Sequence, residues 1–146
     1  MAIVAFLHIS LRVSDLERSC RFYGDALGCE IGPVRGFEGP ATAAPLLHEG
    51  ARARAATVDR DGVAIELVEL NAPRPDVAPD LGRSPVRLVF AVDDLASSLQ
   101  SLRDRGVDVI EESRMCFAQG VVSCFVRDPD GLLIQLYQEP AGVGLP

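Results

Sequence analysis

Four polar side chains interrupt segments that are otherwise apolar and alternate like β-strands: His8, Glu66, Arg87 and Gln135. An imidazole and a carboxylate can move protons or ligate a divalent metal ion. A guanidinium binds anions, and an amide both donates and accepts hydrogen bonds. The function therefore depends on what these four groups do together.

The four residues occupy equivalent positions of an internal repeat. Residues 8–16 resemble residues 87–95, and the segment DGVAIEL at 61–67 recurs as DGLLIQL at 130–136. A repeat of this length is a duplicated supersecondary unit. Arg87 is then the counterpart of His8, and Gln135 is the counterpart of Glu66.

The first module must position His8 and Glu66. Alternation predicts a strand over residues 5–13, followed by a helix that begins with a capping box of Ser14 and Glu17 and ends at Gly28. Further strands are predicted over residues 29–34, 51–58 and 63–69.

A loop rich in Gly, Pro and Ala is predicted over residues 36–50 and contains His48. We interpret His48 as a solvated loop histidine, with closure of the loop over a pocket as the alternative.

The second module repeats this plan. A strand is predicted over residues 86–92, a helix capped by Asp93 and ended by Gly106, and strands over residues 108–111, 121–127 and 132–138. The helix carries Leu95, Leu99 and Leu102 on one face, and residues 128–131 form a tight turn.

Each module is therefore a βαβββ unit of an α+β fold. We expect one domain over residues 1–146, made of a module at 1–70, a proline-rich linker at 71–85 and a module at 86–146. One helix covers one face of a small, antiparallel-rich mixed sheet. The two sheets are expected to pack their other faces together or to curl around a shared cavity.

Composition narrows the classes of partner. The net charge of −7 argues against nucleic acid, no apolar run is long enough to span a membrane, and no secretory signal is expected. The four cysteines show no CxxC spacing and indicate reduced thiols of a cytoplasmic protein. We interpret Cys20 and Cys124 as small hydrophobic residues rather than nucleophiles.

Strand parity predicts that the four polar residues face a common, largely apolar pocket. Phe6, Ala64, Val68, Val89 and Leu133 share their parity. Tyr137 shares the parity of Gln135, and it either presents its hydroxyl to a ligand or packs at the strand end. The alternative is that all these side chains simply face solvent on half-exposed strands.

The chain resembles the vicinal-oxygen-chelate superfamily, which includes glyoxalase I, methylmalonyl-CoA epimerase, extradiol dioxygenases and bleomycin-binding proteins. The motifs that carry the resemblance are His8-Ile9…Val13-Ser14-Asp15-Leu16…Phe22-Tyr23…Leu27-Gly28, then Ile65-Glu66-Leu67, then Asp128-Pro129-Asp130-Gly131…Ile134-Gln135-Leu136. Metal-dependent members carry a His or Gln on the first strand of each module and a Glu on the last, converging on one divalent ion. His8 and Glu66 match this pattern, whereas Arg87 and Gln135 depart from it.

The departure argues against a tightly bound metal. The guanidinium of Arg87 has no lone pair to donate and would repel the ion, and Gln135 offers only a weak amide oxygen. We expect Arg87 to pair with Glu66 instead, with His8 and Gln135 around the pair. The alternative is a site with His8, Glu66 and water as ligands.

Two functional classes remain open. The first is a binding protein that sequesters a small apolar drug or metabolite through His8, Glu66, Arg87, Gln135, Phe6 and Tyr137. The resemblance implies a homodimer, since members of the family commonly dimerise. The second is an enzyme with Glu66 or His8 as general base. It would be either a metal-free epimerase, cyclase or lyase, with Arg87 stabilising an oxyanion, or a metal-dependent lyase, isomerase or dioxygenase.

Overall fold

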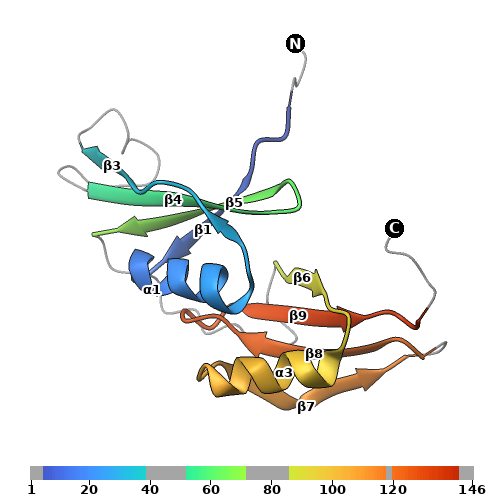
Figure 1. Ribbon diagram of the computed structural model, residues 1–146. Helices are drawn as coiled ribbons and strands as arrows, with labels where there is room; N and C mark the ends of the chain where they lie inside the picture. The colour runs from blue at the N-terminus through green and yellow to red at the C-terminus, as the bar shows by residue number, and fades with distance from the viewer. Residues whose placement is uncertain (1–4, 39–51, 72–85, 118–119, 142–146) are drawn as a thin grey trace. The chain divides into compact units, whose positions relative to one another are not determined.

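The structure is a computed structural model that describes residues 5–38, 52–71, 86–117 and 120–141. The chain divides into two compact units, Met1–Asp76 and Val77–Pro146. Each unit contains one mixed sheet and begins with a strand and a helical segment (Figure 1), which confirms the α+β fold class. The second unit has the predicted βαβββ order, whereas in the first unit four strands follow the helical segment instead of three. The predicted loop at 36–50, apart from its first residues, and most of the predicted linker at 71–85 lie outside the described residues.

The first unit builds its sheet in the order β1-β5-β4-β2, and β3 also pairs with β4. The elements are β1 (Ile9–Val13), α1 (Leu16–Arg21), the π-helical turn η1 (Phe22–Ala26), β2 (Glu30–Ile31), β3 (Arg35–Glu38), β4 (Arg52–Arg60) and β5 (Val63–Leu70). Strand β1 runs parallel to β5, and the other pairs are antiparallel. Asp61 and Gly62 both have positive φ, as a two-residue turn between β4 and β5 requires.

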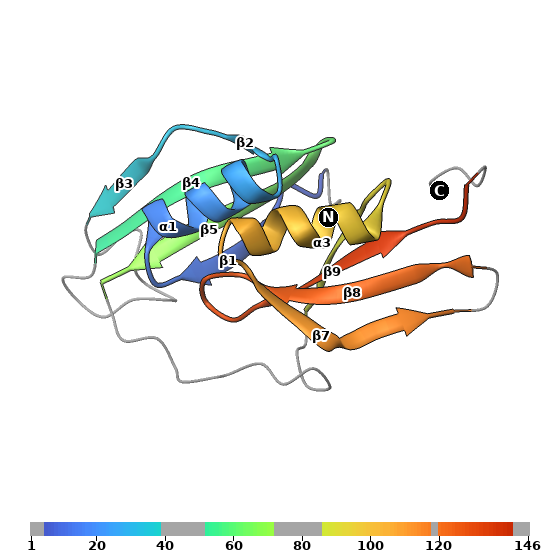
Figure 2. The same cartoon turned by 60° about the horizontal axis from the view of Figure 1, so that its bottom comes forward.

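The helical segment of this unit covers one face of the sheet. Leu16 and Tyr23 are buried, as are Val58, Ile65 and Leu67 on β4 and β5. Helix α1 contacts both of these strands and lies along the sheet in both ribbon views (Figures 1 and 2). Glu66 and the other residues of its parity are therefore on the opposite face.

The second unit has a sheet in the order β6-β9-β8-β7. Its elements are β6 (Leu88–Ala91), α3 (Leu95–Asp104), β7 (Asp108–Cys116), β8 (Val122–Arg127) and β9 (Leu133–Gln138), with β6 parallel to β9. Leu95, Leu99 and Leu102 of α3 are buried, as the sequence predicts, and Gly106 ends the helical segment at φ 76°. The predicted turn at 128–131 is confirmed, because the Asp128 carboxylate accepts hydrogen bonds from the amides of Asp130 and Leu132.

Strand β7 carries a bulge that the sequence analysis missed. Its pairing with β8 shifts between Ile110 and Met115. Inside the bulge, the Ser113 hydroxyl accepts from the Phe125 amide at 2.8 Å and donates to the Ile110 carbonyl at 2.5 Å. A side chain thus replaces the backbone partner that regular pairing would supply.

Both predicted helix caps are wrong by one residue. Asp15, not Ser14, caps α1 by accepting from the Arg18 amide, and Asp94, not Asp93, caps α3 by accepting from the Ser97 amide. In each module the cap directly precedes a leucine that is buried, Leu16 or Leu95. Burial of that leucine fixes where the helix starts, so the residue before it becomes the cap.

Two strand boundaries also differ from the sequence prediction. The first strand begins at Ile9 rather than residue 5, because Phe6 and Leu7 are 82% and 77% exposed and gain nothing from pairing there. The strand expected over residues 29–34 is reduced to the two residues of β2, and β3, which the sequence analysis did not predict, lies beyond it and extends into the predicted loop. Gly32 lies between them, and its amide donates to the Thr57 carbonyl.

Candidate functional site

In the first unit, the structure brings together His8 and Glu66. His8 directly precedes β1, and its Nε2 lies 3.4 Å from Oε2 of Glu66 on β5. Their side chains are 38% and 21% exposed, so the pair is accessible but partly shielded. A carboxylate at this distance can orient the imidazole and share a proton with it, which is the arrangement of a general acid–base pair.

Strand register explains why these two residues meet. Ser10 pairs with Glu66 across the parallel β1–β5 ladder, and His8 precedes Ser10 by two residues. Because side chains two residues apart share a face of a strand, the sheet presents all three on one side.

The same face extends to two residues that the sequence analysis missed, Thr57 and Arg35. Thr57 on β4 is directly opposite Glu66, and its hydroxyl accepts from Nη2 of Arg35 on β3 at 3.4 Å. No local motif marks either residue. Only the alternation of Ala55, Thr57 and Asp59 indicates that Thr57 lies on the Glu66 face.

In the second unit, Arg87 and Gln135 interact with neighbouring residues of their own sheet. The Arg87 guanidinium lies over the Phe125 ring, 5.5 Å from its centroid, and Phe125 is directly opposite Gln135. Gln135 Nε2 donates to Ser123 Oγ at 3.0 Å. A cation over an aromatic face is stabilised by the ring quadrupole, so the Phe125 ring stabilises the Arg87 guanidinium in this position.

Tyr137 and Phe6, the two aromatic residues predicted for the site, are placed differently. Tyr137 is half-buried and pairs with Ser123, on the same face as Gln135. Phe6 is exposed and precedes β1. Their contact with a ligand stays a prediction, and His48 lies outside the described residues.

The strand registers confirm the predicted equivalence of the two modules. Ser10 pairs with Glu66 across β1–β5, and Val89 pairs with Gln135 across β6–β9. His8 and Arg87 precede Ser10 and Val89 by the same two residues. The two modules thus present equivalent positions with different chemistry.

The donor set at these four positions does not fit a divalent metal ion of the usual kind. His8 and Glu66 of the first unit supply two suitable donor atoms, whereas in the second unit Arg87 has no lone pair and Gln135 offers only a weakly donating amide oxygen. Two protein ligands are fewer than such ions ordinarily take in structural or catalytic sites.

A separate group of acidic side chains, Asp15, Glu17 and Glu69, is already committed to structural contacts. Glu69 accepts from the Leu16 amide at 2.7 Å, and Arg54 bridges Glu69 and Glu17. The hydrogen bond from Arg54 holds the pKa of Glu17 below its usual value. In the second unit, the Gln138 side chain accepts from the Leu95 amide in the same way. This contact between the last strand and the start of the helix is therefore a structural feature of both modules.

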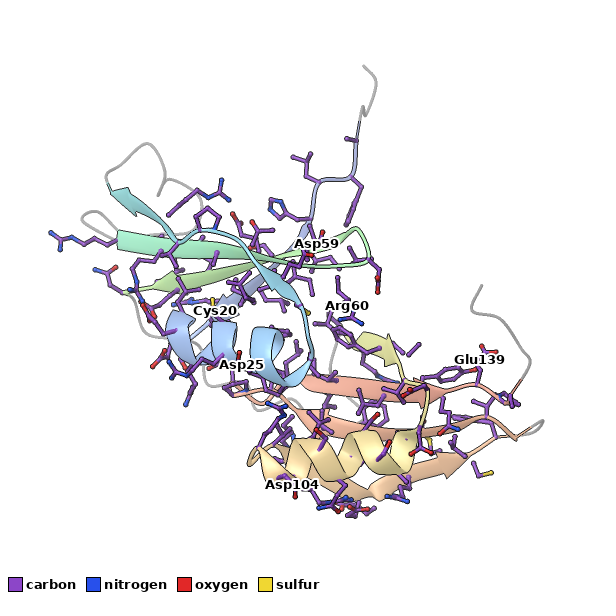
Figure 3. All side chains as sticks on the ribbon, in the orientation of Figure 1. Cys20, Asp25, Asp59, Arg60, Asp104 and Glu139 are labelled. Atoms are coloured by element: carbon purple, nitrogen blue, oxygen red, sulfur yellow. The ribbon has the colours of Figure 1, made fainter. Side chains whose placement is uncertain are left out.

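Cys20 and Cys29 are not activated nucleophiles. All four cysteines are unpaired, and burial raises the pKa of the Cys20 and Cys29 thiols, which favours their protonated form. Figure 3 shows Cys20 between the helical segment and the sheet of the first unit. Cys124 is fully buried in β8, as the sequence analysis expects of a small hydrophobic residue.

A cavity of about 280 Å³ lies within the second unit, where α3 and β8 begin and β7 ends. Its lining includes Leu95, Arg114, Cys116 and Ser123. Ser123 is also the partner of Gln135, so the cavity borders the residues described above.

The sequence pattern of the Glyoxalase/Bleomycin resistance protein/Dioxygenase superfamily matches residues 5–136. Lactoylglutathione lyase of Escherichia coli O157:H7 is 31% identical over 140 residues, covering 95% of this chain and 96% of that protein. The probable lactoylglutathione lyase of a Synechocystis species is 30% identical, with coverage of 90% and 93%.

Solved structures show the same fold. A glyoxalase family protein from Bacillus cereus superposes with a TM-score of 0.79 at 19% identity, covering 95% of this chain and 96% of that one. The trypanothione-dependent glyoxalase I of Leishmania major superposes with a TM-score of 0.61 at 23% identity, with coverage of 91% and 85%. No helix in the described part of the chain is long and apolar enough to cross a membrane.

Proposed function

The chain belongs to the Glyoxalase/Bleomycin resistance protein/Dioxygenase superfamily, and from this premise we propose that it binds and sequesters a small, largely apolar organic molecule without a bound metal. The observation that carries the proposal is the change at the second module's two positions. Arg87 and Gln135 stand where the first module has His8 and Glu66, and each is engaged by its own sheet, Arg87 by Phe125 and Gln135 by Ser123.

The proposed ligand contacts combine apolar surface with a few polar groups. Ala64 and Val68 share the face of Glu66 in the first unit, and Val89, which is 57% exposed, is opposite Gln135 in the second. Small-molecule sites are commonly apolar with a few polar groups that fix orientation. His8, Glu66, Arg87, Gln135 and Tyr137 are the polar groups in this proposal.

Two measurements on protein purified from its own host test this function. Native mass spectrometry is expected to detect a retained organic molecule that is released unchanged. Elemental analysis without chelators is expected to find less than one equivalent of Mn, Fe, Ni or Zn. One equivalent of metal that is lost on His8→Ala would overturn the metal-free proposal.

The second candidate function is an enzyme of the lyase or isomerase type, favoured by the intact His8–Glu66 pair and by the relatives named lactoylglutathione lyase. In this mechanism Glu66 or His8 removes a proton, and Arg87 stabilises the oxyanion that forms. Conversion of the native ligand, or turnover of lactoylglutathione with or without added divalent metal, would favour it over sequestration.

Variants separate the two functions. An enzyme is expected to lose about 10²–10⁴-fold in rate on Glu66→Gln or His8→Ala, as the loss of a general acid or base does. Glu30→Gln, an exposed carboxylate on β2, is the matched control. A pure binding protein turns nothing over, and the same substitutions change only its affinity.

We also propose that the protein acts in the cytoplasm and as a homodimer. The first proposal is supported by four unpaired cysteines, which are typical of a reducing compartment. The second is supported by the superfamily, whose members commonly form dimers.

A further inference from the structure

A row of complementary polar groups crosses one face of the first unit's sheet. The Arg35 guanidinium donates to the Thr57 hydroxyl, Thr57 is opposite Glu66, and Glu66 lies 3.4 Å from His8. The row therefore runs from a cation on β3 through a hydroxyl on β4 to an acid–base pair at β5 and the start of β1.

The charge of Arg35 is not neutralised by an acid within the part of the chain that the structure describes. Arg54 and Arg60 of the neighbouring β4 form ion pairs with Glu17 and Asp61, whereas Arg35 forms none there. Arg35 is also exposed. Most of its five N–H donors are therefore available, in the planar fork that matches a carboxylate.

We propose that Arg35, assisted by Thr57, binds the acidic group of the ligand, so that the ligand is an organic anion rather than a neutral molecule. The inference rests on the proposed function because it names the class of ligand that the His8–Glu66 face receives. Its apolar body lies along that face, and its carboxylate lies against Arg35.

The charges of the row also set the orientation of such a ligand. Strands β3 and β5 are separated by β4, and two strand spacings amount to about 10 Å. A carboxylate is attracted to Arg35 and repelled by Glu66. The ligand therefore binds in one direction, with its acidic group several bonds from the part that lies at His8 and Glu66.

A matched pair of probes tests the proposal, 3-phenylpropionate and the neutral 3-phenylpropionamide. The full-length chain is titrated with each, and the backbone amide shift of Thr57 is followed by NMR. We expect the acid to bind more tightly than the amide, and Arg35→Gln to weaken the acid about tenfold while leaving the amide unchanged, as the loss of charge-assisted hydrogen bonds does.

Two further variants show whether the binding of the acid depends on the charge of Arg35, on its guanidinium geometry or on the net charge of the chain. Arg35→Lys is expected to recover part of the affinity, since it keeps the charge but not the fork. Arg21→Gln removes the same charge from exposed α1 and should leave both probes unaffected.

Equal binding of acid and amide to the unmodified chain, or no saturable shift at Thr57 with either, would overturn the proposal. The proposed function is decided separately, by the native ligand and the metal content.

Discussion

At the scale of single residues, the two modules carry different side chains at structurally equivalent positions. The first module places an imidazole beside a carboxylate, and the second places a guanidinium over a ring and an amide against a hydroxyl. The Arg87–Glu66 pair expected from the sequence joins the two units and stays a prediction.

Restoring the family's residues tests whether the four positions act on one ion. Arg87→His is expected to gain measurable Zn or Ni affinity that the parent lacks, and adding Gln135→Glu should strengthen it, because a carboxylate is a better ligand than an amide. Isothermal titration measures both. Arg87 is exposed, so its replacement should cost little stability.

His8→Ala in the Arg87→His background is the control and should abolish the gained affinity. If neither restored variant binds metal, the four side chains do not act together, and the repeat reflects shared ancestry of the fold only.

At the scale of elements, a hydrogen bond in each module links the start of the helix to the end of the last strand. Asp15 and Asp94 cap the helices, and Glu69 and Gln138 accept from the following leucine amides. The two hydrogen bonds are equivalent, although the acceptor is the carboxylate of Glu69 in the first module and the amide oxygen of Gln138 in the second.

The cap of α3 predicts a pH-dependent stability. Hydrogen bonding to the Ser97 amide lowers the pKa of Asp94 from its ordinary value of 3.8. Its contribution is therefore complete above that value and is lost as the pH falls through the lower folded-state pKa. Asp94→Ala should lower Tm at pH 7, and the difference from the parent should shrink below about pH 3.8.

Asp93→Ala is the matched control, since Asp93 is the neighbouring exposed carboxylate that the sequence analysis took for the cap. A larger loss of Tm for Asp93→Ala than for Asp94→Ala would contradict the assignment.

The β7 bulge makes a second prediction at this scale. Ser113→Ala leaves the buried Phe125 amide without its acceptor, which is expected to cost about 1–3 kcal/mol of unfolding free energy. Urea unfolding measures it. Ser101→Ala, on the exposed face of α3, should be neutral or slightly stabilising. Equal effects of the two substitutions would show that the hydroxyl is not needed for the bulge.

At the scale of the whole molecule, the chain is two units of the same plan, each with one helix over one sheet. Whether equivalent modules pair within a chain or across a dimer is left open by the sequence.

Light scattering after size exclusion tests the oligomeric state. We expect twice the chain mass of 15.6 kDa at micromolar concentration, because the helix of each unit, in the described part of the chain, packs on one face of its sheet and the second face needs a partner of its own. A mass that stays at that of one chain up to about 100 µM, above the dissociation constant of a stable dimer, would contradict the dimer.

The sequence by itself determined the repeat, the βαβββ order of the second module, that of the first module apart from β3, and the equivalence of His8 with Arg87 and of Glu66 with Gln135. These follow from alternation and spacing, which are local, and the registers of β1–β5 and β6–β9 agree with them. The helix caps were missed by one residue because two adjacent polar residues can each cap a helix, and burial of the following leucine chooses between them.

Only the tertiary structure decided which side chains meet. Arg35 against Thr57 and Arg87 over Phe125 join residues far apart in the chain, and Thr57 lies opposite Glu66 across the β4–β5 hairpin. These contacts depend on strand register and on β3, a strand that the sequence analysis did not predict, and a shift of one residue would turn every side chain to the other face. The sequence alone therefore did not predict that Arg35 lies on the same face as the His8–Glu66 pair.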